Sequence, residues 1–141
     1  MPRSRQPSCS SLLLRPLARY LSARPDLPGA LAVRVARACD HDRIPVAEAV
    51  ELTQRAAELT AEPAIGLRIA MFIALGDFEV LEWVATSAAT WREANQVVCR
   101  YVRVLNEAAD YRQIVCADKS HLMLGSALAS LTGLFLVGPG A

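Results

Sequence analysis

The chain has 141 residues, of which 53% are hydrophobic and 21% are charged. It is too apolar for a disordered tail, and it is long enough for one domain with a hydrophobic core. The net charge of +1 argues against a nucleic-acid-binding surface that extends over the whole chain.

The first 43 residues are rich in arginine, with eight arginines against three aspartates. No acidic residue precedes Asp26, a composition shared by organellar transit peptides. The alternative, which we favour, is an amphipathic helix with Pro16 in its opening turn and one apolar face, formed by Leu13, Leu17, Ala18 and Leu21. In this interpretation the arginines lie on solvent-exposed faces of helices. The alternative is that they bind phosphate groups.

Cysteine and histidine patterns give no sign of catalysis or metal binding. Cys9, Cys39, Cys99 and Cys116 have no close spacing, so we expect free thiols in a reducing compartment. The segment 39–42 contains Cys, Asp and His, but without a second cluster it is better read as a polar turn than as a metal site. No nucleophile and base stand at a known motif spacing. We therefore expect no cofactor, no metal and no enzymatic activity.

Two helices are predicted after a proline-rich turn. The first covers residues 29–39, and the second begins near Pro45, where the missing amide hydrogen is not needed. Glu51 and Arg55 have the spacing of a helical ion pair. One face of the second helix is apolar and should be buried, comprising Val46, Ala49, Val50, Leu52, Ala56, Ala57 and Leu59.

Residues 64–75 carry one charge, Arg68, which predicts a central, largely buried helix. Gly76 should end it, and Asp77 should cap the next helix by accepting from its free amides. Trp83 lies on the polar side of that next helix. It therefore either packs beneath a neighbouring element, which we favour, or marks a contact surface.

The last helix has the clearest start signal. Thr90 and Glu93 have the spacing of a capping box. Its apolar arc should comprise Trp91, Ala94, Val97, Val98, Tyr101, Val102, Val104 and Leu105. Short β-branched and aromatic runs then flank a polar turn at residues 117–120, which predicts a hairpin. The fold class is therefore α+β, with an N-terminal bundle of about five to six helices followed by a β-hairpin or the start of a sheet.

From about Leu12 to Asp118, and most strongly between Ile44 and Arg112, the sequence resembles the arabinose-binding-type N-terminal domain of AraC-family bacterial transcription regulators. The resemblance rests on a T-x-[DE]-P-x-[LI]-G-L-R turn, a G-D-F-G-x-L-G stretch and a helix led by Thr with E-A and R-Y pairs. Glu79 and Glu82 stand where that family commonly has small residues. The matching residues are Thr60, Glu62, Pro63, Ile65, Gly66, Leu67, Arg68, Gly76, Asp77, Phe78, Leu81, Thr90, Glu93, Ala94, Arg100 and Tyr101.

The resemblance implies a cytoplasmic regulatory domain that senses a small-molecule effector, as a homodimer or in association with full-length relatives. It implies residues 1–128 as an incomplete domain, cut before its helix-turn-helix DNA-binding part, so that no direct DNA binding is expected. Residues 129–141 are expected to be an irregular apolar tail. The alternatives are a stand-alone protein interaction module and a small tail-anchored membrane protein, although the apolar run is short for a membrane span.

Three aromatic residues are the candidates for an effector pocket. Trp83, Tyr101 and Tyr111 could form aromatic walls between the helices and the sheet. The alternative, which we favour, is that all three fill the core.

Overall fold

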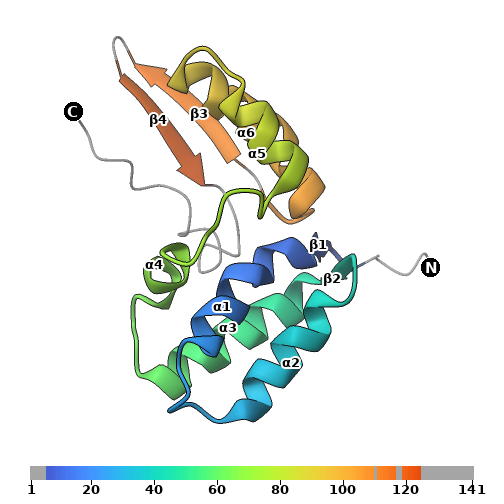
Figure 1. Ribbon diagram of the computed structural model, residues 1–141. Coiled ribbons are helices and arrows are strands. Elements are labelled where there is room, and N and C mark those ends of the chain that lie inside the picture. Colours follow the sequence, from blue (N-terminus) through green and yellow to red (C-terminus); the bar gives the residue numbers. More distant parts are fainter. Residues whose placement is uncertain (1–5, 110, 117–118, 125–141) are drawn as a thin grey trace.

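The computed structural model describes residues 6–109, 111–116 and 119–124, the last two ranges through their backbone. It is α+β, as predicted, and has two parts (Figure 1). The helical bundle, residues 8–70, contains β1 (Ser8–Ser10), the 3-10 helix η1 (Ser11–Leu14), α1 (Arg15–Ser22), α2 (Gly29–Cys39), β2 (Arg43–Pro45), α3 (Val46–Thr60) and α4 (Ile65–Ala70). The α5–α6 unit, residues 79–124, contains α5 (Glu79–Thr86), α6 (Trp91–Leu105), β3 (Tyr111–Cys116) and β4 (Lys119–Leu124).

The core of the helical bundle is formed where α1, α2 and α3 meet. Leu17, Val35 and Leu52 supply one buried side chain from each helix, each at most 1% exposed. Pro16 stands in the first turn of α1, where it leaves no amide unpaired. The predicted amphipathic helix is therefore confirmed, and its apolar face packs against the other two helices.

The bounds predicted for α2 and the start predicted for α3 are confirmed, but the predicted ion pair is wrong. Glu51 accepts a hydrogen bond from Arg34 of α2 at 2.9 Å, and Arg55 bonds to Glu58 at 2.8 Å. Because an ion pair within one helix contributes only a few tenths of a kcal/mol, a partner on the neighbouring helix readily displaces it.

The predicted central helix at residues 64–75 is wrong in its length and in its burial. The helix α4 ends at Ala70, and only Ile65 and Ile69 turn a buried face to the bundle. Met71 is 76% exposed and Leu75 is 91% exposed. The carbonyl of Phe72 accepts a hydrogen bond from Arg19 instead of from a following turn of helix. An apolar sequence therefore did not produce a buried helix here: beyond Ala70 the Ala74 amide donates to Asp77 and the Phe72 carbonyl accepts from Arg19.

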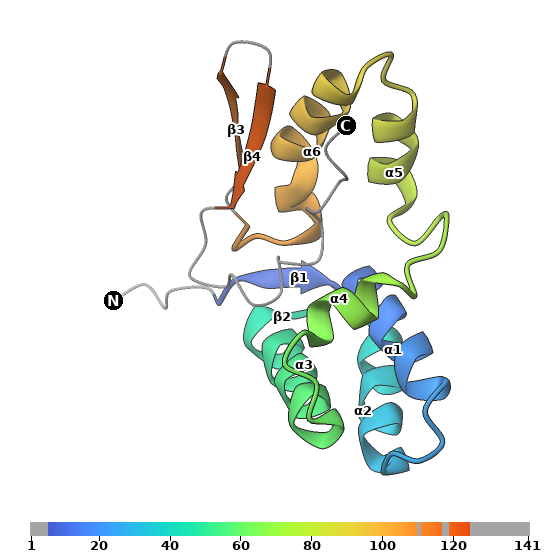
Figure 2. The same cartoon turned by 90° about the vertical axis from the view of Figure 1, so that its left-hand side faces the viewer.

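Two antiparallel pairs of strands complete the fold. The short ribbon β1–β2 pairs Cys9 with Ile44, and Figure 2 shows β1 on the side of the bundle helices that faces the α5–α6 unit. The hairpin β3–β4 runs from Tyr111 opposite Leu124 to Cys116 opposite Lys119. A hairpin was predicted here, but Lys119 and Ser120, which were placed in its turn, belong to β4. In Figure 2 α6 lies between α5 and the hairpin. Residues 117–118 of the predicted turn and the predicted tail at residues 129–141 lie outside the described residues.

The capping box of α6 is confirmed with one change. The hydroxyl of Thr90 accepts from the Glu93 amide at 3.2 Å, while the Glu93 carboxylate accepts from Ala89 at 3.0 Å rather than from Thr90. The predicted apolar arc is only partly buried. Its members Val102 and Leu105 are buried, but Trp91, Tyr101 and Val104 are 69%, 45% and 66% exposed.

Three observations concern membranes, metals and thiols. Among the residues that the structure describes, no helix combines the length and the apolarity needed to cross a membrane. The same residues contain no group of three side chains able to hold a metal ion. Cys9 and Cys39 are free thiols.

Candidate functional site

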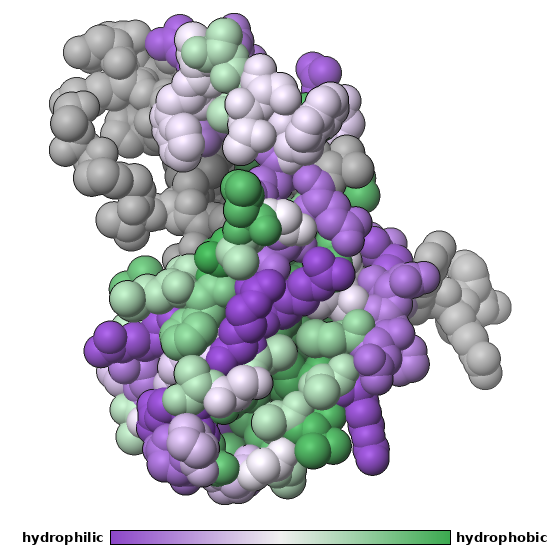
Figure 3. All heavy atoms as spheres, viewed as in Figure 1, coloured by the Kyte–Doolittle hydropathy of each residue, from purple (hydrophilic) through white to green (hydrophobic). Residues whose placement is uncertain are grey.

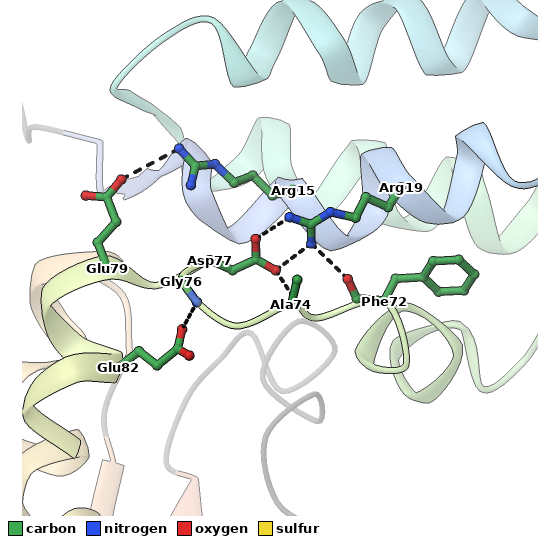
Figure 4. Close-up of polar contacts among 8 residues, drawn as sticks. All are labelled: Arg15, Arg19, Phe72, Ala74, Gly76, Asp77, Glu79 and Glu82. Carbon is green, nitrogen blue, oxygen red and sulfur yellow. Dashed lines mark hydrogen bonds and ion pairs between the residues drawn. The ribbon is translucent and has the colours of Figure 1, made fainter. Parts of the chain in front are cut away.

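An ion pair joins the helical bundle to the segment that leads into α5 (Figure 4). From α1, Arg19 donates to both carboxylate oxygens of Asp77, with Nη1 2.6 Å from Oδ2 and Nη2 2.5 Å from Oδ1. It also donates to the carbonyl of Phe72 at 2.9 Å. The Asp77 carboxylate accepts a further hydrogen bond from the Ala74 amide at 2.7 Å. The Asp77 side chain is only 2% exposed, so this connection is largely shielded from water on the acidic side.

The hydrogen bonds from Arg19 lower the pKa of the Asp77 carboxyl below its ordinary value, although burial opposes this change. Asp77 therefore remains ionised at neutral pH. The predicted role of Asp77 as the cap of α5 is wrong. Its carboxylate is bound to Arg19 and to a preceding amide, and α5 begins without a side-chain cap.

The backbone at Glu79 adopts a conformation that suits glycine. Its φ is +48°, in the left-handed region, and Gly76 three residues earlier has a φ of +91°. A residue with a β-carbon is disfavoured there by about 1–2 kcal/mol. The resembling family's G-D-F-G motif places glycine at the position of Glu79, and the left-handed backbone gives the physical reason. Here a carboxylate stands instead, 3.6 Å from the Arg15 guanidinium.

A second polar connection joins the β1–β2 ribbon to the end of α6. Arg43 of β2 donates to the Val104 carbonyl at 2.7 Å and to the Ser8 hydroxyl and carbonyl at 2.8 and 3.0 Å. The Ser8 amide donates to the Glu107 carboxylate at 2.7 Å, and the Glu107 amide donates back to the Ser8 carbonyl at 3.0 Å. Among the described residues, the bundle is thus connected to the segment before α5 at one place and to the end of α6 at another.

A cavity of about 510 Å³ lies between the two parts, beside both connections. This volume is within the range that small-molecule ligands occupy in proteins. The helical bundle contributes Ser10, Leu12 and Arg43 to the wall. The segment before α5, together with α5 and α6, contributes Phe78, Glu79, Val84, Tyr101, Val104 and Leu105. We call this cavity the inter-part pocket.

The three predicted pocket residues fall in different places. Tyr101 lies in the wall of the inter-part pocket. Trp83 of α5 is 72% exposed and does not line it, so the favoured interpretation that Trp83 packs beneath a neighbour is wrong. Tyr111 begins β3, and its side chain lies outside the described part of the chain. The inter-part pocket lies between the bundle and the helices α5 and α6.

Sequence reasoning missed the contributions of Leu12, Arg43 and Val104 to the pocket, because no local motif marks them. Phe78 and Glu79 could have been found, since they follow directly on the Gly76-Asp77 pair of the motif. The remaining motif residues stabilise helices at other places. For example, Arg68 of α4 donates to Glu62 at 2.9 Å and lowers the pKa of that carboxyl.

The surface of the bundle near these connections is polar. Figure 3 shows hydrophilic side chains running as a band over α1 between areas of hydrophobic side chains. Arg15 and Arg19 of this helix are 43% and 42% exposed at their side chains. Arg15 and Arg19 therefore connect α1 to Glu79 and to the segment before α5, while their side chains remain partly exposed to solvent.

These features define an α+β domain with a ligand-sized pocket between two connected parts. The chain belongs to the family of the arabinose-binding domain of AraC transcription regulators, N-terminal, which matches residues 23–133. Comparison with curated proteins returns no match. The family is a regulatory ligand-binding domain rather than an enzyme, so the chain is a regulatory sensing domain of the kind found in AraC regulators.

Proposed function

We propose that this domain senses a small-molecule effector in the inter-part pocket and passes the signal on by changing how the helical bundle and the α5–α6 unit are held together. The observation that carries the proposal is that both parts contribute side chains to the wall of the pocket. We place the protein in the cytoplasm, where a transcription regulator acts.

The pocket wall is adjacent to both polar connections. Phe78 and Glu79 directly follow Asp77, which binds Arg19. Val104 lines the pocket, and its backbone carbonyl accepts a hydrogen bond from Arg43. An effector that moves either wall therefore acts on a neighbouring connection.

Regulation requires that the effector bind one arrangement more tightly than the other, because equal affinity shifts no equilibrium. The two connections give the two parts a defined arrangement without effector. An effector that fits a wider or narrower pocket pulls the parts into a second arrangement. The family description names arabinose, so a sugar is the first class of effector to consider.

The neutral fluorescent probe N-phenyl-1-naphthylamine tests the pocket, because its emission rises in apolar surroundings. We expect saturable binding to the wild-type protein. Val104→Trp should fill the pocket and weaken binding by roughly tenfold or more, since the added ring occupies the cavity. The matched control is Val33→Trp on α2, where valine is 52% exposed and does not line the pocket. Equal binding by the Val104→Trp and Val33→Trp variants would refute the proposal.

Self-association is a second candidate function, and two exposed tryptophans favour it. Trp83 in α5 is 72% exposed and Trp91 at the start of α6 is 69% exposed. Exposed aromatic residues are enriched in the buried parts of protein interfaces. Sedimentation velocity should show a dimer that dissociates when both tryptophans are replaced by serine. A wild-type protein that sediments as a monomer contradicts this candidate.

A further inference from the structure

The wall of the inter-part pocket is poorly suited to a sugar. A sugar presents a hydroxyl on nearly every carbon, and each buried hydroxyl needs a hydrogen-bonding partner to replace water. Among the lining residues that the structure describes, most are instead apolar or aromatic: Leu12, Phe78, Val84, Tyr101, Val104 and Leu105. The wall therefore favours a ligand with a hydrocarbon body.

Two of the polar residues in the wall are already engaged. The Ser10 hydroxyl accepts a hydrogen bond from the Leu12 amide at 3.3 Å. The Arg43 guanidinium donates to Ser8 twice and to the Val104 carbonyl, and it lies 3.6 Å from the Glu107 carboxylate. Arg43 therefore already uses three of its five N–H donors within the fold, and the nearby Glu107 carboxylate offsets its positive charge. An anionic head group is therefore disfavoured.

Glu79 has capacity left for a ligand. Its carboxylate is 3.6 Å from Arg15, beyond ordinary hydrogen-bond distance, and its side chain is 58% exposed. A carboxylate can accept about four hydrogen bonds. Two aromatic residues, Phe78 and Tyr101, line the same cavity, and aromatic faces attract cations. A carboxylate with aromatic neighbours is suited to an ammonium group.

The carboxylate of Glu79 stands on a backbone conformation that favours glycine. Glu79 is held at a φ of +48°, where glycine is the easier choice. A side chain kept at a disfavoured backbone conformation in a pocket wall is an observation that points to a function for that side chain.

We infer that the inter-part pocket takes an apolar amine, with its hydrocarbon body against the aliphatic and aromatic wall and its ammonium group at Glu79, rather than a sugar or a carboxylic acid. This inference rests on the proposed sensing function and specifies the chemical class of the effector. Glu79 is then the residue that determines specificity.

Displacement of N-phenyl-1-naphthylamine by matched competitors tests this inference. The competitors are 4-phenylbutylamine, 4-phenylbutanol and 4-phenylbutyrate, which share one apolar body and differ in the head group, together with L-arabinose. We expect the amine to displace the probe at a concentration roughly tenfold lower than the carboxylate, with the alcohol between them. L-arabinose should displace the probe least.

The variant Glu79→Gln removes the charge but keeps the size of the side chain and its β-carbon, so the backbone strain is unchanged. It should bring the amine, the alcohol and the carboxylate to within about twofold of one another. The matched control is Glu82→Gln, three residues along on α5, whose side chain accepts from the Gly76 amide and does not line the pocket. This control should keep the wild-type preference for the amine.

The possible outcomes distinguish a failure of the amine preference from a failure of the sensing function. If the probe binds in a manner sensitive to Val104→Trp but the carboxylate or L-arabinose displaces it best, the amine inference is overturned and the sensing function stands. A preference for the amine that persists in Glu79→Gln overturns the role of Glu79. If Val104→Trp leaves probe binding unchanged, the sensing function itself fails.

Discussion

Replacing Glu79 by alanine and by glycine measures the backbone strain at the start of α5. Both variants lose the carboxylate and its 3.6 Å contact with Arg15, so the difference between them reports the backbone alone. At a φ of +48° the β-carbon of alanine costs about 1–2 kcal/mol. Glycine gains more entropy on unfolding, which offsets roughly 0.4–1 kcal/mol of this. The glycine variant should therefore be the more stable by about 0.5–1 kcal/mol.

The assay is urea unfolding followed by far-ultraviolet circular dichroism, with equal m values required for the comparison. A matched control comes from Ala36, an exposed residue inside α2, where Ala36→Gly should destabilise the fold by about 1 kcal/mol. Glycine should therefore give the more stable protein at position 79, and alanine should give the more stable protein at position 36. If the alanine variant at position 79 equals or exceeds the glycine variant in stability, the left-handed conformation and the argument built on it are wrong.

Three further predictions concern the ion pair, a buried thiol and a helix cap. Because Arg19 lowers the folded-state pKa of Asp77, this carboxylate stabilises the fold above the ordinary pKa of about 3.9, and the contribution is lost as the pH falls through the lower folded-state value. Asp77→Asn should lower the free energy of unfolding at about pH 7 and make it depend less on pH in acid. Urea unfolding at a series of pH values measures this, and a variant whose stability falls with pH as steeply as that of the wild type would contradict it. Burial raises the pKa of Cys9 to about 11, so roughly one molecule in a thousand carries the thiolate at about pH 8. Mass spectrometry should find Cys9 alkylated by iodoacetamide only in urea, and rapid labelling of the folded protein would refute its burial. Thr90→Ala should cost about 1 kcal/mol in urea unfolding, since it removes the acceptor for the Glu93 amide, and an unchanged midpoint would argue against the cap.

The start and end signals of several helices were sufficient to predict them from sequence. Pro45 stands directly before α3, where its missing N–H is not needed, and Thr90 accepts a hydrogen bond from the Glu93 amide. Both signals act within one helical turn, so their effect does not depend on the rest of the fold. The bounds of α2, the position of α6 and the hairpin followed from such local signals and from periodicity. The family followed from the order of short motifs along the chain.

The pocket and the connections beside it could not be predicted in the same way. Arg19 and Asp77 are 58 residues apart, and the Arg43 side chain reaches a carbonyl 61 residues further along the chain. Past the end of α4 the backbone binds side chains instead, since the Ala74 amide donates to Asp77 and the Phe72 carbonyl accepts from Arg19.

The burial of α6 shows the same limit of local patterns. Periodicity identified its apolar side, yet Val104 on that side is 66% exposed and lines the pocket, whereas Val102 and Leu105 are buried. The sequence by itself determined where most of the helices begin, because caps and periodicity act within a few residues, but it did not determine the end of α4. Only the tertiary structure decided which faces are covered and where a cavity remains, because both depend on side chains that packing brings together from distant parts of the chain.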